Sequence, residues 1–296
     1  MDGIIAGMGE VLWDMLPEGK KLGGAPANFA YHIAQFGFES TVLSAVGTDA
    51  PGDEALEILW NKGLAERIER VDYPTGTVQV TLDGAGIPQY EIREHVAWDN
   101  IPFTARIEEL ARRTRCVCFG SLAQRSPVSR DTIGRFLDAM PDGTDRYKVF
   151  DINLRQHFYS KEVIEASLGR CDILKINDEE LTVIERMFGI GPDDPKRTCG
   201  ALIARYGLRM LILTCGAEGS YVFSADEASF LETPRVTVAD TVGAGDSFTA
   251  SFCAALLCGQ TLREAHRLAV DVSAYVCTQA GAMPELPEEL RNRLKR

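Results

Sequence analysis

Short runs of apolar residues alternate along the chain with longer segments in which apolar positions recur every three or four residues. The short runs predict β-strands, and the periodic segments predict amphipathic helices. The predicted strands are Ile4–Gly7, Ser40–Val46, Cys116–Gly120, Lys148–Asp151, Ile173–Ile176 and Met210–Thr214. The predicted helices are Pro26–Phe36, Gly52–Lys62, Asp131–Met140, Lys161–Leu168, Glu179–Phe188 and Cys199–Tyr206. This alternation predicts an α/β fold with a parallel sheet covered by helices on both faces.

One region departs from this rhythm. Gly76–Leu82 and Gln89–Val96 alternate apolar and polar residues, and a Gly- and Pro-containing segment joins them, which predicts a β-hairpin. One face of the hairpin is apolar and carries Val78, Val80, Leu82, Tyr90, Ile92 and Val96. We expect a small antiparallel flap whose apolar face is covered by a ligand, by the main body or by a second subunit.

Composition narrows the class of protein. The chain has 296 residues, of which 45% are hydrophobic and 25% charged, and these values exclude disorder, collagen and coiled coil as the main architecture. The formal net charge of −12 argues against a general affinity for nucleic acid or anionic membranes. A local basic pocket for a small anion remains compatible with that charge. The length fits one large α/β domain or two smaller ones.

The cysteines and the hydropathy indicate where the protein works. The eight cysteines show no Cys/His zinc spacing, and Cys116 and Cys118 lie on one face of a predicted strand, as core residues do. Free thiols favour a reducing compartment, so we expect a cytoplasmic protein. The N-terminal residues lack a basic region and a long apolar core, and no window reaches about 18 apolar residues, so we expect neither a signal peptide nor a membrane span.

The strongest chemical signal is a Gly-Ala-Gly turn, residues 243–245, followed by Asp246 and a run with helical periodicity that Gly259 closes. Asp246 therefore lies at a helix N-terminus, after small residues that leave backbone N–H groups uncovered. Such a place binds anions. The alternative is that Asp246 only caps the helix. Capping alone does not need two glycines, nor Asp240 six residues upstream, so the spacing favours the functional interpretation.

Five motifs in order resemble those of the ribokinase-type (PfkB) carbohydrate kinases. Asp240–Asp246 is similar to the D-T-x-G-A-G-D signature of this family, and Gly23–Asn28 has the G-G-A-P-A-N form common in its fructokinase-like branch. Asn177–Glu180 matches N-x-x-E, and Thr214–Gly219 matches T-x-G-x-x-G. Gly281–Pro284 matches the segment near the adenine and a monovalent-cation site. The resemblance covers essentially the whole chain.

The resemblance refines the expected architecture. It implies a Rossmann-like, ribokinase-like three-layer sandwich that forms a single domain over residues 1–296, with a small β-sheet lid built from about residues 11–23 and 73–98. It implies a small-molecule sugar and ATP as partners. The apolar flap face favours a homodimer formed through the lid.

Phosphoryl transfer to an alcohol needs a base beside the hydroxyl and hydrogen-bond donors around the migrating phosphoryl group. The resemblance implies that Asp246 is this base. The backbone N–H groups of Gly243, Ala244, Gly245 and Asp246 would form an anion hole at the helix start. Glycine suits the turn because a Cβ would crowd the phosphate.

The resemblance also places the acceptor sugar. Asp14 and Asn28 would hydrogen-bond sugar hydroxyls, and Gly24 belongs to the Gly23-Gly24 hinge on which the flap closes. Arg155 ends a D-x-N-x-R segment, as in fructokinase-like members, and would face phosphates or substrate. Taken alone, Asp14 is equally well a loop acid, and Arg155 a surface ion-pair partner. Ala123–Arg125 is a weaker candidate for substrate contact.

The remaining motifs are expected at the nucleotide. Asn177 and Glu180 would hold water around the Mg²⁺ that accompanies ATP. Without the resemblance they are better explained as the capped start of a helix, and both roles can coexist. Thr214, Gly216 and Gly219 would contact the nucleotide. Asp240, Val242 and Gly281 are candidates for a monovalent cation site, with K⁺ as the candidate ion and backbone carbonyls as its main ligands.

Two other classes of kinase are excluded by missing motifs. The chain has no G-x-x-x-x-G-K-[ST] and no H-R-D or D-F-G set, so it is neither a P-loop kinase nor a protein kinase. His32, His95, His157 and His266 show no ligand spacing and are expected to be structural.

The sequence thus predicts an ATP-dependent sugar kinase that phosphorylates a primary hydroxyl, with fructose to fructose 6-phosphate as the leading reaction. Ribose and 2-keto-3-deoxygluconate are the alternative acceptors within the family. A non-catalytic sugar-binding relative and a nucleoside kinase of the same fold remain as further alternatives. The intact Asp246 and Gly-Ala-Gly turn argue against the former, and the latter would need a larger apolar acceptor pocket.

Overall fold

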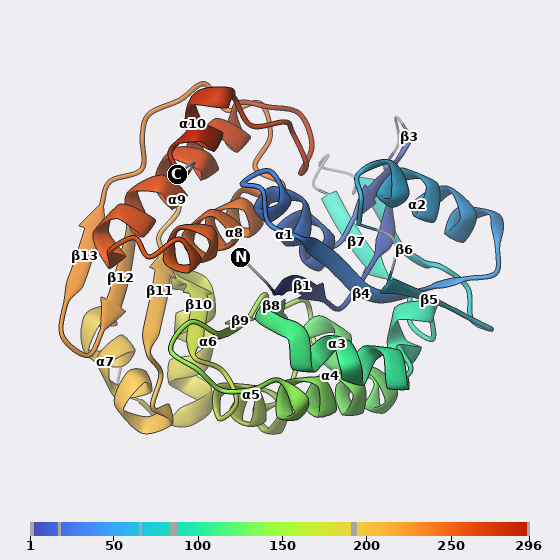
Figure 1. Cartoon of the computed structure of the whole chain (residues 1–296), viewed down its shortest axis with the longest axis horizontal. Coiled ribbons are helices and arrows are strands. Elements are labelled where there is room, and N and C mark those ends of the chain that lie inside the picture. Colours follow the sequence, from blue (N-terminus) through green and yellow to red (C-terminus); the bar gives the residue numbers. More distant parts are fainter. Residues whose placement is uncertain (1–2, 17–18, 65–66, 83–87, 191–193, 295–296) are drawn as a thin grey trace.

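The computed structural model describes residues 3–16, 19–64, 67–82, 88–190 and 194–294; for 80–82 and 88–90 it describes the backbone (Figure 1). A nine-stranded sheet runs through the molecule in the order β13-β12-β11-β10-β9-β8-β1-β4-β5. Its strands are β1 Ile4–Met8, β4 Ser40–Gly47, β5 Ile68–Val71, β8 Thr114–Phe119, β9 Tyr147–Asp151, β10 Ile173–Asn177, β11 Met210–Thr214, β12 Ser220–Ser224 and β13 Ala228–Leu231. The strands from β11 to β5 are parallel, and β12 and β13 add an antiparallel edge.

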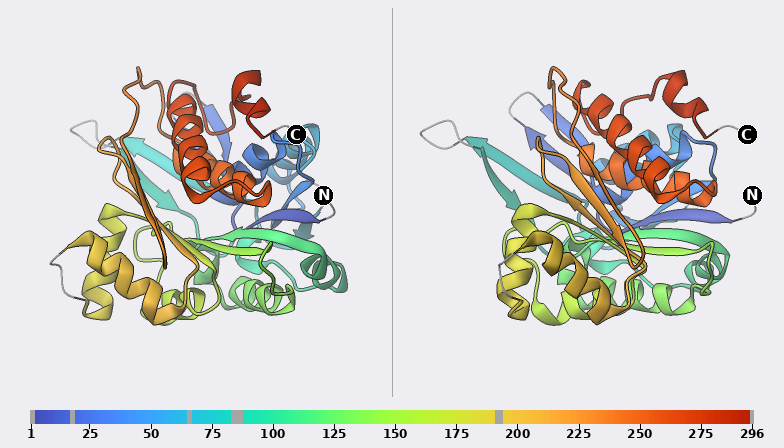
Figure 2. Two further views of the ribbon diagram at one scale, coloured as in Figure 1. Left: turned by 60° about the vertical axis from the view of Figure 1, so that its left-hand side comes forward. Right: turned by 90° about the vertical axis from the view of Figure 1, so that its left-hand side faces the viewer.

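Helices cover both faces of this sheet (Figures 1 and 2). The helices are α1 Ala25–Ala34, α2 Ala50–Asn61, α3 Ala105–Arg113, α4 Pro127–Ala139, α5 Lys161–Leu168, α6 Asp178–Phe188, α7 Pro195–Tyr206, α8 Ala244–Leu257, α9 Leu262–Cys277 and α10 Glu288–Asn292. α1, α8 and α9 pack on one face, around Phe29, Phe252 and Leu268. α3 to α7 pack on the other, around Phe136 and Leu202. The strands between the two helical layers are almost wholly buried and apolar, as parallel strands covered on both faces must be.

A second, smaller sheet stands off the main body, and we call it the lid sheet (Figure 2). Its strands are β3 Gly19–Gly23, β2 Leu12–Leu16, β6 Gly76–Leu82 and β7 Pro88–Ile92, in that spatial order. The predicted hairpin is therefore present, although its second strand ends at Ile92 rather than Val96. Val96 instead is the N-cap residue of the short 3-10 helix η2, Ala97–Asn100.

The main body covers the part of the hairpin's apolar face that lies nearest to it. Val78 and Ile92 are opposite each other in register, only 4% and 8% exposed, and packed into the core on the α3–α7 side. Of the three covers expected for this face, the main body therefore provides one. The connection at residues 83–87 lies outside the described residues.

The predicted fold class is confirmed, because strands and helices alternate around a mostly parallel sheet with a small additional sheet. The elements predicted from periodicity are all present, with ends that differ by up to four residues. Within the described part of the chain, no helix has the length and apolar character needed to cross a membrane.

The chain order locates a crevice. From β1 the sheet grows outward through β4 and β5, and then the chain returns to β8, on the other side of β1, and continues to β13. Ligands of open α/β sheets bind at such a switch point, outside the carboxyl ends of the strands. Here those ends lead into Gly9-Glu10 after β1 and Gly120 after β8.

Candidate active site

Asp246 lies at the switch point, in the first turn of α8. The helix begins after Gly243, whose φ of 78° is a left-handed conformation that favours glycine. A Cβ at Gly243 would also collide with Ala282. The Ala244 N–H bonds the Thr241 carbonyl at 3.3 Å, while the N–H groups of Gly245 and Asp246 fall in the first turn, where a helix has no carbonyl to offer them. This turn therefore presents donors suited to an anion.

Asn28 holds the Asp246 carboxylate. Asn28 lies on α1, is 4% exposed, and donates from Nδ2 to Asp246 Oδ2 at 2.7 Å. Its Oδ1 is buried and, among the described residues, has no hydrogen-bond partner. A buried acceptor without a partner is costly, and a ligand hydroxyl placed between Asn28 and Asp246 would satisfy it.

Burial, together with the charge of the neighbouring Asp151, raises the pKa of Asp246 to about 6. The hydrogen bond from Asn28 and the charges of Lys175 and Arg155 oppose this rise. The side chain can thus accept a proton near neutral pH and release it again, which is the behaviour of a general base.

Gly24 allows the start of α1 to approach the backbone of Glu10 closely. It precedes α1 with φ 124° and ψ 116°, and a Cβ there would collide with the carbonyl of Glu10. Glu10 is itself 4% exposed, and burial raises the pKa of its carboxyl to about 7. Glu10 was not among the site residues predicted from the sequence. A carboxylate in the turn that ends a buried strand was the available signal.

Asp14 faces the site from the lid sheet. It lies on β2 opposite Lys21 of β3, and its carboxylate occupies the space that a Cβ on Gly23 would need. Burial raises the pKa of Asp14, whereas Arg155 and Lys21 lower it. The charge of Arg155 acts on Glu10, Asp14 and Asp246 alike, so the structure brings the residues predicted for the sugar into one neighbourhood.

Asn177 and Glu180 form a capping box at the start of α6. The Asn177 side chain accepts from the Glu180 N–H at 2.7 Å, and Glu180 Oε2 accepts from the Asn177 N–H at 2.9 Å. The capped-helix interpretation is therefore correct at these positions. Glu180 Oε1 also accepts from the Leu154 N–H at 2.9 Å, so the same carboxylate holds the loop that carries Arg155.

Thr214 ends β11 directly beside Asn177 of β10. The turn that follows is tight: the Cys215 N–H bonds the Gly219 carbonyl at 2.8 Å, and Gly216 and Gly219 have φ of 52° and 143°. A Cβ on Gly219 would collide with the Leu231 carbonyl. The two predicted nucleotide motifs thus meet at the same edge of the sheet.

Asp240 joins the two loops predicted for a monovalent cation. Its Oδ1 accepts from the Val242 N–H at 3.0 Å, and its Oδ2 accepts from the Gly281 N–H at 3.1 Å. His32 of α1 donates to the Ala282 carbonyl at 2.8 Å and so holds the loop that contains Gly281. In the described residues, His, Cys, Asp and Glu side chains nowhere gather in threes that could hold a metal ion.

Arg125 was a weak candidate for substrate contact, and the structure corrects this. Its Nε and Nη2 donate to Asp99 at 2.8 and 2.9 Å, and its Nη2 donates to the Arg93 carbonyl at 2.6 Å. Its guanidinium lies over the rings of Trp98 and Phe158. Arg125 is therefore bound within the protein, at the point where the lid sheet joins the main body.

The cavity beneath Asp246 is small. It is lined by Glu10, Gly120, Asp151, Asn153 and Asp246 together with apolar neighbours, and its volume of about 10 Å³ is that of about one water molecule. A sugar does not fit there, so it would lie outside this cavity, on the side of the lid sheet. Asn153 has φ 43°, a strained conformation for a residue other than glycine.

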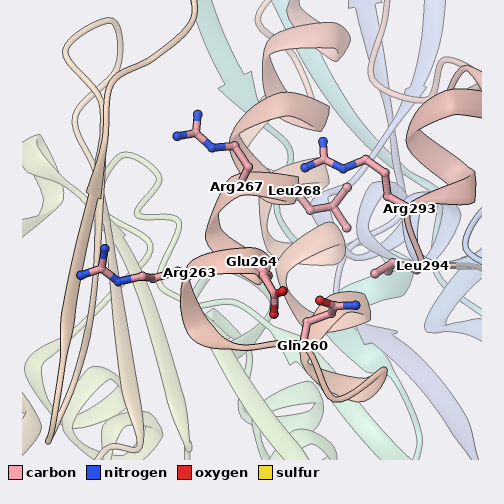
Figure 3. A pocket seen from close by; sticks show the side chains of 7 residues that line it. All are labelled: Gln260, Arg263, Glu264, Arg267, Leu268, Arg293 and Leu294. Carbon is pink, nitrogen blue, oxygen red and sulfur yellow. The ribbon is translucent and has the colours of Figure 1, made fainter.

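Larger cavities lie elsewhere. One of about 370 Å³ lies between the start of α9 and the C-terminal segment (Figure 3). Arg263 and Arg267 reach its rim from α9, and Arg293 reaches it from the other side and pairs with Asp271 at 2.6 Å. Its arginines do not converge on one point, and it does not belong to the site around Asp246.

The chain has a ribokinase-like α/β fold, with a glycine turn and a carboxylate together at its switch point. A family model described as pfkB family carbohydrate kinase matches residues 18–289. The chain therefore belongs to the pfkB family of carbohydrate kinases.

Individual relatives match most of the chain at low identity. The ATP-dependent 6-phosphofructokinase of Thermoanaerobacterium thermosaccharolyticum is 29% identical over 278 residues, which cover 91% of this chain and 83% of the relative. The fructokinase of Klebsiella pneumoniae is 29% identical over 309 residues, 97% of each. A solved sugar kinase of Pyrococcus horikoshii is 26% identical, with a TM-score of 0.82 and coverage of 98% and 99%. The ATP-bound fructokinase of Xylella fastidiosa has a TM-score of 0.84 at 21% identity, covering 99% and 98%.

Proposed function

We propose that this carbohydrate kinase is an ATP-dependent fructokinase, which transfers the γ-phosphoryl group of ATP to the primary hydroxyl of fructose and forms fructose 6-phosphate. The observation that carries the proposal is the Asn28–Asp246 pair at the start of α8. Here the Asp246 carboxylate can take a proton, and the buried Asn28 Oδ1 has no hydrogen-bond partner among the described residues. The backbone N–H groups in the first turn of α8 lie at the same place.

In the proposed reaction, Asp246 accepts the proton of the sugar hydroxyl as that oxygen attacks phosphorus. The Asn28 amide orients the carboxylate, and Asn28 Oδ1 accepts from a second hydroxyl of the sugar. Asp14 binds hydroxyls from the lid side. The amides of Gly245 and Asp246 stabilise the charge of the migrating group. Closing of the lid sheet would exclude the water that competes with the sugar.

The residues present fit a magnesium nucleotide. The glycine turn at 243–245 leaves space and donors for phosphate oxygens, and Thr214, Gly216 and Gly219 form the neighbouring turn that would contact the nucleotide. Asn177 and Glu180 offer the oxygen atoms that Mg²⁺ prefers, and they would hold the ion through water. ATP supplies the phosphoryl group and Mg²⁺ offsets its charge.

The named relatives support a ketohexose acceptor. Four similar bacterial proteins, from Klebsiella pneumoniae, Rhizobium leguminosarum, Escherichia coli and Salmonella typhimurium, carry the name fructokinase. The polar groups Asp14, Asn28 and Arg155 suit a small polyol better than the flat apolar base of a nucleoside.

Fructose 6-phosphate is a second candidate acceptor. It is favoured by the 6-phosphofructokinase relative and by Lys21, an exposed lysine opposite Asp14 on the lid sheet. An exposed ammonium there would attract a phosphate group on the sugar. Lys20, next to it, is already paired with Glu54.

An acceptor panel tests the proposal. ADP release is measured with fructose, fructose 6-phosphate, ribose, 2-keto-3-deoxygluconate and adenosine, each at saturation and each with its kcat/KM. Fructose is expected to give the largest kcat/KM. Preference for fructose 6-phosphate that is lost in Lys21→Met would transfer the assignment to the second candidate. No turnover with any acceptor would favour a non-catalytic sugar-binding role.

Three further properties belong to the proposal. The loops joined by Asp240, with Val242 and Gly281, would hold K⁺ through backbone carbonyls, which potassium titration of the activity tests. A homodimer through the lid sheet is supported by its two edge strands, β3 and β7, since an open edge can pair with another chain. Free, mostly buried cysteines support a cytoplasmic location.

A further inference from the structure

A lysine lies inside an otherwise apolar strand of the central sheet. β10 reads Ile-Leu-Lys-Ile-Asn, and Lys175 in its middle is only 9% exposed. Lysine is rarely buried unless it is paired, because removing an ammonium from water is costly. The mechanism proposed above does not use this residue.

Lys175 connects the sheet to the start of α8. Its Nζ lies 3.1 Å from Asp151 Oδ1, on the neighbouring strand β9 and in register with it. Asp151 Oδ2 in turn accepts from Thr249 Oγ1 of α8 at 3.2 Å, and that hydroxyl also lies 3.0 Å from the Gly245 carbonyl. All three side chains are buried. The contacts therefore end on the turn that carries Gly245 and Asp246.

The ammonium also lies directly against this turn. A Cβ on Gly245 would lie 3.0 Å from Lys175 Nζ, which is closer than real Cβ contacts normally are. The glycine thus serves two needs, because it leaves the amide uncovered on one side and admits the lysine on the other.

The charges facing Asp246 come from several elements. Glu10 after β1 and Asp151 of β9 are acidic, Cys118 of β8 is a thiol, and Arg155 after β9 and Lys175 of β10 are basic. Arg155 is exposed, so water screens its charge. Glu180 of α6 is a further acidic group that acts on Lys175. In the described residues, Lys175 is thus the buried cation of this neighbourhood, among the buried carboxylates of Glu10, Asp151 and Glu180.

We propose that Lys175 is a positioning residue of the phosphoryl-transfer site: held by Asp151, its ammonium fixes the first turn of α8 and keeps Asp246 ionised at neutral pH. The inference rests on the proposed function of Asp246 as base. It predicts effects of opposite sign for the two members of the Lys175–Asp151 pair, which a purely structural ion pair would not produce.

The acid limb of kcat against pH is the first test, measured with the best acceptor. Lys175→Met is expected to move its midpoint upward by about one pH unit and so to lower kcat at pH 7 about twofold, with the sugar KM changed less than about threefold. Asp151→Asn is expected to move the midpoint downward. The double variant restores the balance of charge and is expected to lie between the two single variants.

Lys148→Met is the matched control. Lys148 lies on β9 next to β10, and its ammonium pairs at 2.9 Å with Asp142, an exposed aspartate outside the site. The acid limb of kcat against pH is expected to be the same in Lys148→Met as in the unchanged protein. If Lys175→Met does not fold, Asp151→Asn still tests the downward shift, and Lys175→Arg, which keeps the charge, is expected to leave the midpoint unchanged.

A second readout does not depend on turnover. Carbon-13 NMR of labelled aspartate, with the Asp246 signal identified by its loss in Asp246→Asn, follows the titration of this carboxylate in the protein without ligands. A midpoint that is unchanged in Lys175→Met, or shifts of the same sign in Lys175→Met and Asp151→Asn, would overturn the inference. Absence of turnover in the unchanged protein would overturn the proposed function alone.

Discussion

A carboxylate that accepts a proton works only while it is ionised, so the pKa of Asp246 determines the pH range of the proposed reaction. Burial and Asp151 raise this pKa to about 6. We predict that kcat is level above about pH 7 and falls to half near pH 6, because protonated Asp246 cannot act as base. Initial rates at saturating sugar and ATP between pH 4.5 and 9 measure this. A level profile down to pH 4.5 would contradict the assignment.

Replacing the carboxylate by its amide separates binding from chemistry. Asp246→Asn is expected to lower kcat by about 10²–10⁴-fold, the usual contribution of a general base. Sugar affinity is expected to change little, since the amide retains an oxygen that can accept from Asn28. Calorimetric titration of sugar into the variant checks the second point. Equal turnover in variant and unchanged protein would exclude Asp246 as the base.

Candidate site residues that belong to a sequence motif could be predicted from the sequence. A residue whose role depends on its pairing partner on a neighbouring strand could not. Asp246, Asn28, Asn177 and Thr214 were all located by their signatures. Lys175 was missed, because its importance depends on the register that sets it opposite Asp151 and on the packing of α8 above both. The available signal for Lys175 was its place among the apolar residues of the predicted strand Ile173–Ile176.

At the scale of elements, one buried ion pair joins the lid sheet to the main body. Arg125, the last residue of the 3-10 helix η3 (Leu122–Arg125), pairs with Asp99 of η2 and reaches the Arg93 carbonyl just after β7. Both side chains are less than 8% exposed. Arg125→Met is expected to lower the free energy of unfolding by about 3–5 kcal/mol, since Asp99 is left buried without its partner. Urea denaturation followed by fluorescence measures the loss.

The double variant Arg125→Met/Asp99→Asn is the control for this prediction. It removes both charges, so its loss is expected to be clearly smaller than that of Arg125→Met alone. A single-variant loss below about 1 kcal/mol would show that the pair contributes little to holding these elements together.

Elements with local signals were predicted well, and elements that depend on distant partners were not. α5 and β11 have their predicted ends. β2 and β3 were expected only through the family resemblance, as part of the lid at about residues 11–23. The residue pattern did not predict them, because β3 carries two lysines among its five residues and β2 pairs with β6, which lies about sixty residues away. α9 was also not predicted, although the capping box formed by Thr261 and Glu264 was an available signal for its start.

At the scale of the whole molecule, buried acids and buried histidines have opposite effects on stability. Burial lowers the pKa of His32 and His266 to about 4, and raises those of Asp246 and Glu10 to about 6 and 7. As the pH falls from 7 to 4, the unfolded chain takes up protons at the histidines and the folded chain at the acids. The histidines therefore cost stability and the acids add it, so these four groups largely cancel.

Removing the two acids should expose the effect of the histidines. Ionisation of Glu10 and Asp246 destabilises the fold as the pH rises above their unfolded pKa values, so Glu10→Gln/Asp246→Asn lacks this penalty. Relative to the unchanged protein, the variant is expected to gain about 4 kcal/mol between pH 5 and 8. Urea unfolding at several pH values measures the difference. A gain that does not change with pH would contradict the assigned shifts.

The contact between Asn28 and Asp246 joins residues 218 positions apart. During synthesis the first strand must wait in the middle of an unfinished sheet, since its neighbour β8 and the helix α8 leave the ribosome much later. A nascent chain that ends before α8 therefore cannot assemble the crevice. A product released before that point has the Asn28 amide but lacks the carboxylate that the amide holds, so it would be without the base of the proposed reaction.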